Sequence, residues 1–156
     1  MQELPHHYAV TAAGAVDGDV ELTAERLPSL RSASPAEFGG PGDRWSPETF
    51  LVGAVADCFI LTFRAVARAS KLSWTLLQCD VTGTLDRADR VTQFTRLDVR
   101  AHLTVPAGAD PDQARRALEK AERSCLIVNS LKAAIHLEPE VDVAAEPVGA
   151  LTGVAH

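Results

Sequence analysis

The chain has 156 residues, of which 46% are hydrophobic and 23% charged, and its net charge at pH 7 is −6. These values are typical of a single soluble globular domain over residues 1–156 and exclude a largely disordered chain. The acidic balance and the scattered basic residues also argue against nucleic acid as a partner, because binding a phosphate backbone requires clustered Lys and Arg.

Extended segments and a loop make up the first part of the chain. Residues 8–31 are rich in β-forming side chains and contain an Asp-Gly-Asp turn at 17–19, which predicts a hairpin. Residues 32–45 are rich in Gly and Pro and therefore predict a loop.

A long helix is expected to begin directly after this loop. Ser46 can cap its first turn, Pro47 has the φ angle of a first helical residue, and Glu48 complements the positive end of the helix dipole. The apolar periodicity predicts that the helix ends near Ser70.

The middle of this helix, residues 50–63, is apolar on nearly every side. The segment is shorter than the about 20 residues that cross a bilayer, and the N-terminus lacks the pattern of a signal peptide. We therefore expect a cytoplasmic protein that is not embedded in a membrane. Because a helix that is apolar all round must be covered on every side, we also expect an intimate homodimer.

A second hairpin and a second helix are expected next. Residues 74–85 and 92–105 alternate apolar and polar side chains on either side of a polar turn at 86–90, which predicts a hairpin with one buried face. Asp110 and Pro111 repeat the pattern of a cap followed by proline. The apolar stripe of the helix they begin comprises Ala114, Ala117, Leu118, Ala121, Cys125 and Val128.

The chain is expected to end with a strand over residues 134–143 and a loose tail over residues 144–156. Strands grouped around two separate helices, without strict alternation of strand and helix, predict an α+β fold.

Three cysteines, Cys58, Cys79 and Cys125, are the main candidates for chemistry. An odd number of cysteines without an export signal disfavours a framework of structural disulfides. Cys79 lies in the middle of a predicted strand on its apolar face, so we interpret it as a core residue. Cys58 and Cys125 lie on the apolar faces of the two predicted helices, and their positions alone leave a core role and a reactive role open.

The sequence around the outer two cysteines resembles a known family. Residues 34–40, 46–59 and 121–125 resemble segments of the OsmC/Ohr proteins, a family that includes peroxide reductases. The middle segment combines a Ser-Pro-Glu helix start with a Cys-Phe pair whose cysteine lies 10 residues after the glutamate, and the last segment carries the second cysteine. The resemblance extends over roughly residues 8–143.

This resemblance implies an OsmC-like fold, with antiparallel sheets around two core helices, an intertwined homodimer, and a thiol peroxidase without a bound cofactor. In such an enzyme the Cys58 thiolate attacks an organic hydroperoxide and becomes a sulfenic acid, which Cys125 converts to a disulfide. An external dithiol reductant, in the Ohr branch typically a protein-bound lipoyl group, then restores the thiols. The resemblance also implies an activating arginine held by the glutamate at the position of Glu48.

The chain departs from the family pattern at three places. Asp57 adjoins Cys58, where the family usually has a small residue. The first hairpin lacks the arginine of the Ohr branch, and the nearest substitutes are Arg44, Arg31 and Arg26, of which Arg44 is favoured because the loop places it beside Glu48. Leu126 occupies the position after the second cysteine, where both main branches usually have proline. These departures indicate a divergent branch and leave the preferred peroxide, the reductant and the retention of turnover open.

Four aromatic residues, Trp45, Phe50, Phe59 and Phe63, are candidates for lining a pocket for the apolar tail of a peroxide. Aromatic residues at this spacing are also typical of a helix that packs in a core, so both roles stay open. The histidines lack the spacing of metal ligands, and no metal site is expected.

Reduction of organic hydroperoxides is therefore the favoured function. The alternative is a non-peroxidatic dimer of the same fold that binds a small ligand or senses oxidants through its cysteine pair.

Overall fold

The computed structural model describes residues 2–145. Its contacts divide the chain into two compact units, Met1–Leu51 and Val52–His156, and the expectation of a single domain stays a prediction. Most of the expected tail, from residue 146 onward, lies outside the described residues.

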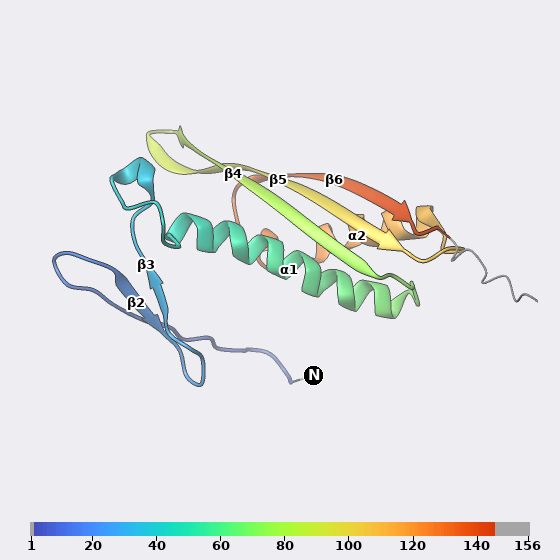
Figure 1. Cartoon of the computed structure of the whole chain (residues 1–156), viewed down its shortest axis with the longest axis horizontal. Helices are drawn as coiled ribbons and strands as arrows, with labels where there is room; N and C mark the ends of the chain where they lie inside the picture. Colours follow the sequence, from blue (N-terminus) through green and yellow to red (C-terminus); the bar gives the residue numbers. More distant parts are fainter. Residues whose placement is uncertain (1, 146–156) are drawn as a thin grey trace, which may run out of the picture. The chain divides into compact units, whose positions relative to one another are not determined.

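The first unit contains a small antiparallel sheet in the order β1-β2-β3 (Figure 1). Its strands are β1 (Thr11–Ala13), β2 (Val20–Thr23) and β3 (Leu30–Ser32), and a 3-10 turn, η1 (Ala36–Phe38), follows in the loop. Gly18 has a φ of 92° in the turn between β1 and β2, which a residue without a Cβ adopts freely. The expected hairpin is confirmed, and β3 adds a third strand.

Helix α1 (Pro47–Ala69) begins where the sequence predicted. Ser46 and Thr49 cap it reciprocally: the Ser46 Oγ accepts from the Thr49 N–H at 3.2 Å, and the Ser46 N–H donates to the Thr49 Oγ1 at 2.8 Å. Such a pair satisfies two of the amides that a helix start leaves unbonded. The helix ends one residue before the expected Ser70, and Lys71 follows with a φ of 54°.

The second unit is built on a three-stranded sheet in the order β4-β5-β6. Strands β4 (Leu76–Ala88) and β5 (Val91–Val105) form the expected antiparallel hairpin, although β4 extends into the region 86–90 that was predicted as a turn. Helix α2 (Pro111–Ser124) and the 3-10 turn η2 (Val128–Ser130) connect β5 to β6 (Ala134–Val143).

Strands β5 and β6 pair in parallel along their whole length. The α+β class is confirmed, but the expectation that the sheets are antiparallel is wrong for this pair, and the sheet is mixed. The connection through α2 explains the difference, because a parallel return requires a long crossover, which a helix usually supplies.

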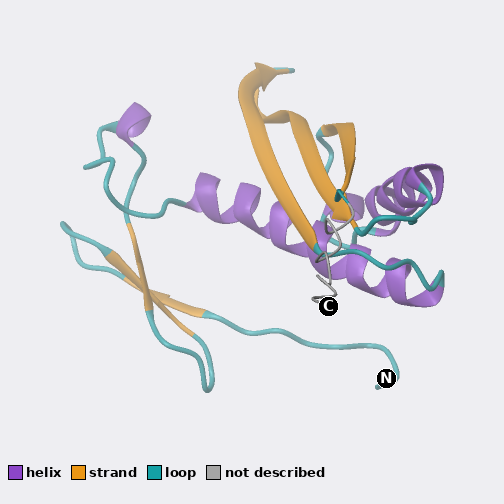
Figure 2. Ribbon diagram, turned by 45° about the vertical axis from the view of Figure 1, so that its right-hand side comes forward, coloured by secondary structure: helices purple, strands orange, loops and turns teal. Residues whose placement is uncertain are grey.

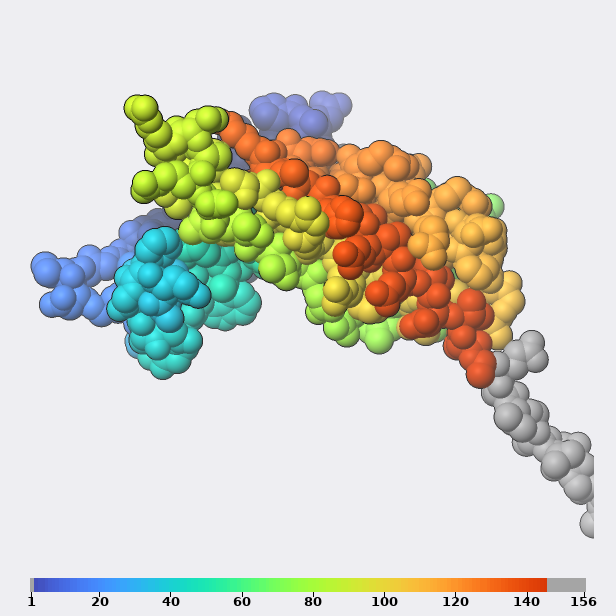
Figure 3. Space-filling model, turned by 90° about the horizontal axis from the view of Figure 1, so that it is seen from above, coloured from blue at the N-terminus to red at the C-terminus, as the bar shows by residue number. Residues whose placement is uncertain are grey.

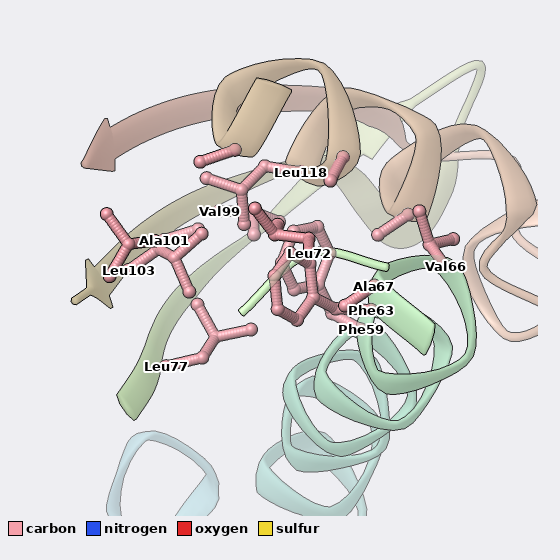
Figure 4. Close-up of a cluster of buried hydrophobic side chains, with 14 of the residues drawn as sticks. Phe59, Phe63, Val66, Ala67, Leu72, Leu77, Val99, Ala101, Leu103 and Leu118 are labelled. Carbon is pink, nitrogen blue, oxygen red and sulfur yellow. The ribbon is translucent and has the colours of Figure 1, made fainter. Parts of the chain in front are cut away.

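Both helices cover the same face of this sheet (Figures 1 and 2). Figure 4 shows side chains from α1, α2 and the strands meeting in one buried cluster. The fully buried members with the largest volumes include Phe59, Phe63, Leu97, Leu103 and Leu118.

The opposite face of the sheet is open and charged, and Figure 3 shows β6 at the surface. Ion pairs there join Arg96 to Asp98 and Arg100 to Glu138.

Helix α1 is long and apolar enough to cross a membrane when judged by length and composition alone, although only 22% of its most apolar window is buried within the chain. The apolar run at 50–63 was too short to suggest this. Core helices of globular proteins can have the same length and composition, so the likeness is weak evidence for a membrane span.

Candidate functional site

Cys58 lies in the middle of α1 and is half-buried. Its Sγ lies 3.8 Å from the Oγ1 of Thr62, one helical turn further along the same face. The sulfur is therefore held on one side by α1 itself, while it keeps some access to solvent.

Cys125 is fully buried and forms the C-cap of α2. The sequence placed it on a helical stripe that continued to Val128, and this is wrong because α2 ends at Ser124. Cys125 is extended, with φ −68° and ψ 116°, and its N–H donates to the Glu122 carbonyl at 3.2 Å. The change of backbone conformation turns the chain away from the helix axis at this residue.

The structure brings the two thiols together, and both are free cysteines. Burial acts to raise the pKa of Cys58. Hydrogen bonds from the Ile127 amide and from the Cys125 thiol oppose this effect, and the Thr62 hydroxyl and the Leu126 amide add to them. These four donors outweigh burial, so the pKa of the Cys58 thiol lies below its ordinary value.

The pKa of the Cys125 thiol lies above its ordinary value. Burial is the largest cause, and the hydrogen bond to Cys58 and the negative charge of its thiolate act in the same direction. The amides of Val128 and Ile127 oppose the increase without cancelling it. Cys58 therefore loses its proton more readily than Cys125. Cys125 keeps its proton and donates it to Cys58 in a hydrogen bond.

Cys79 lies on the inner face of β4 and packs against the core. Burial, together with the charges of Asp80 and Cys125, raises the pKa of Cys79 to about 12. A thiol with such a pKa is protonated near neutral pH and reacts poorly as a nucleophile, which agrees with the interpretation of Cys79 as a core residue.

The expected partnership of Arg44 and Glu48 is not present among the described residues. Arg44 is exposed and pairs with Asp19 at 3.3 Å and with Asp43 at 3.0 Å. One carboxylate oxygen of Glu48, Oε2, is buried without a hydrogen-bond partner in the described part of the chain. The guanidinium group of Arg44 is therefore paired with two other carboxylates, and the expectation that it partners Glu48 is wrong for the described chain.

The four candidate pocket residues fall into two pairs. Trp45 is exposed and stacks on Phe50, with ring centroids 5.6 Å apart and planes inclined by 5°. Phe59 and Phe63 are 1% and 0% exposed and belong to the core of the second unit. Phe59 and Phe63 therefore form part of the core in this chain, which favours the core role over the pocket role for these two residues.

The chain matches a known protein family. The model of the OsmC-like protein family matches residues 40–140. The chain belongs to the OsmC family.

Individual proteins also resemble this chain in sequence or in fold. The uncharacterized protein YmaD of Bacillus subtilis (strain 168) is 30% identical over 142 residues, which cover 88% of this chain and 95% of that protein. An OsmC-like protein of unknown function from Vibrio cholerae has the same fold, with a TM-score of 0.80 at 14% identity over 86% of this chain and 99% of its own. An organic hydroperoxide resistance protein of Legionella pneumophila superposes with a TM-score of 0.69 at 26% identity, over 90% of this chain and 100% of its own.

Sequence reasoning missed several donors at the cysteine pair of this OsmC family member. The hydroxyl of Thr62 could have been found, because a residue four positions after a helical cysteine lies on the same face. The main-chain amides of Leu126, Ile127 and Val128 could not, since every residue except proline has an amide and only the fold decides where it points.

Among residues 2–145, no three His, Cys, Asp or Glu side chains are grouped closely enough to hold a metal ion.

Proposed function

We propose that this OsmC family member reduces organic hydroperoxides to alcohols through a two-cysteine cycle. The observation that carries the proposal is the pairing of a half-buried Cys58, whose pKa is lowered, with a buried Cys125 that retains its proton. The likeness to the hydroperoxide resistance protein of Legionella pneumophila supports it.

The first step uses the reactive form of Cys58. Its thiolate attacks the terminal oxygen of the hydroperoxide, the O–O bond breaks, and the leaving alkoxide takes a proton from water to become an alcohol. Cys58 is then a sulfenic acid. Its partial exposure gives a peroxide access to the sulfur.

The second step uses the neighbouring Cys125. Its sulfur attacks the sulfenic sulfur of Cys58, a disulfide forms, and hydroxide leaves with the thiol proton as water. An external dithiol, such as a lipoyl group, reduces this disulfide by exchange and is itself oxidised to a cyclic disulfide. We place the reaction in the cytoplasm, where reducing conditions keep cysteines as thiols.

The working form we propose is a homodimer. Leu61 of α1 is 50% exposed in the single chain, and a second subunit would remove this apolar surface from water. Light scattering should give twice the mass of the chain at micromolar concentration, and a stable folded monomer would contradict this part of the proposal.

A steady-state assay tests the proposal. Cumene hydroperoxide should be consumed over many turnovers with dihydrolipoamide or dithiothreitol as reductant, and Cys58→Ser should abolish the reaction. Consumption of a single equivalent per chain, with no further turnover in either reductant, would favour the alternative of a redox sensor or small-ligand binder.

A further inference from the structure

The donors that surround the Cys58 sulfur in the described part of the chain are all uncharged. Two are side chains, the hydroxyl of Thr62 and the thiol of Cys125, and two are the main-chain amides of Leu126 and Ile127. A half-buried thiolate needs several donors to offset its loss of hydration. This set supplies them without a guanidinium or ammonium group.

The path of the backbone after α2 explains why amides are available there. The N–H of Cys125 still bonds to the helix, and the N–H groups of Asn129 and Ser130 donate to the carbonyls of Cys125 and Ile127 at 3.0 Å each. The amides of residues 126–128 lie between Cys125 and Asn129 in the chain. They donate to no main-chain carbonyl among the described residues. These amides are therefore free to donate to the two cysteine sulfurs: those of Leu126 and Ile127 act to lower the pKa of Cys58, and those of Val128 and Ile127 act to lower that of Cys125.

Thr62 contacts the same sulfur from α1. It is half-buried on α1, and the fixed rise of the helix places its hydroxyl one turn from Cys58, at the 3.8 Å given above. Its position depends only on α1, whereas that of the amides depends on the end of α2. The two kinds of donor are therefore independent of each other.

We infer that the Thr62 hydroxyl and the main-chain amides of Leu126 and Ile127 together hold the Cys58 sulfur as a thiolate, and that these uncharged donors are the activating device of this site. The inference deepens the proposed function, because it names the groups that prepare the nucleophile. It also assigns a role to Leu126 that depends on its amide and not on its side chain.

Because Leu126 lies at the surface, a substitution can delete its main-chain N–H with little loss of side-chain packing. The side chain is 74% exposed, so its replacement costs little packing. The preceding Cys125 is extended, with ψ 116°, a conformation that a following proline favours. Leu126→Pro should therefore be accommodated while it deletes the N–H, and Leu126→Ala is the matched control that keeps it.

The test measures alkylation of Cys58 by iodoacetamide and requires no peroxide. Trypsin separates the three cysteines into the peptides 45–64, 72–87 and 124–132, so mass spectrometry follows Cys58 by itself. Rates are compared at about pH 6, where the thiolate fraction limits the reaction. Failure of the enzyme to turn over peroxide would leave this measurement unaffected.

We expect Thr62→Val and Leu126→Pro each to slow the alkylation of Cys58 by about threefold to tenfold, the effect of losing one hydrogen bond to a partly exposed anion. Thr62→Ser and Leu126→Ala keep their donors and should react at the rate of the unmodified protein. If Thr62→Val reacts as fast as Thr62→Ser, and folded Leu126→Pro as fast as Leu126→Ala, the inference is overturned. Should Leu126→Pro fail to fold, the threonine pair decides the outcome.

Discussion

Replacing Phe63 by alanine distinguishes a core residue from a pocket residue. Phe63 is 0% exposed, and its ring meets Trp74 edge to face, with centroids 5.3 Å apart and planes inclined by 80°. A buried aromatic side chain removes about 150–250 Å² from water. At about 25 cal/mol per Å² this corresponds to about 4–6 kcal/mol, which overlaps the range of about 3–5 kcal/mol for truncating a buried Phe to Ala.

We therefore expect Phe63→Ala to lower the free energy of unfolding by about 4 kcal/mol. Urea unfolding followed by circular dichroism measures this loss, with all proteins at one concentration because subunit association also contributes to stability. Phe63→Leu, which keeps most of the apolar volume, should lose much less. Phe38→Ala is the matched control, because Phe38 is 60% exposed and its removal should change stability by less than about 0.5 kcal/mol. The core assignment fails if Phe63→Ala unfolds like the unmodified protein and changes only the preference among peroxides.

The remaining predictions concern the three thiols. Cys79→Ala should leave peroxide turnover nearly unchanged, and an inactive but folded variant would show that Cys79 takes part in the reaction. Cys125→Ser and Cys125→Ala should both stop turnover and let the Cys58 sulfenic acid persist, detectable with dimedone. Cys125→Ala, which also removes a donor worth about 0.5–1 kcal/mol, should in addition slow alkylation of Cys58 by about twofold to fivefold relative to Cys125→Ser. Because the pKa of Cys58 is lowered and the thiolate is the reactive form, the rate of its reaction with peroxide should rise with pH through a midpoint below that of an ordinary thiol; a midpoint above that value would contradict the assignment.

Local signals in the sequence predicted the starts of both helices. The cap of α1 depends on Ser46 and Thr49, and that of α2 on Asp110, whose side chain accepts from the Asp112 N–H at 2.9 Å. These bonds join residues two or three positions apart, so the sequence contains all the information needed.

The direction in which β5 and β6 pair could not be predicted from the sequence. Alternation in residues 134–143 predicted the strand β6 with its observed bounds, but alternation is the same for parallel and antiparallel partners. The direction follows from α2, which carries the chain back across the sheet before β6 begins.

The end of α2 was misplaced for a related reason. Ala121, Cys125 and Val128 continue the helical spacing, and no glycine or proline marks a stop. The structure shows that the helix stops at Ser124, and this turn of the backbone is what presents the amides after Cys125 to the Cys58 sulfur.

The two-cysteine mechanism predicts one covalent product above all. One equivalent of cumene hydroperoxide, added without reductant, should join peptides 45–64 and 124–132 through a disulfide between Cys58 and Cys125 within one chain, with the loss of two hydrogens from the intact mass. Recovery of Cys58 as sulfenic or sulfinic acid, with Cys125 still a free thiol, would contradict the mechanism.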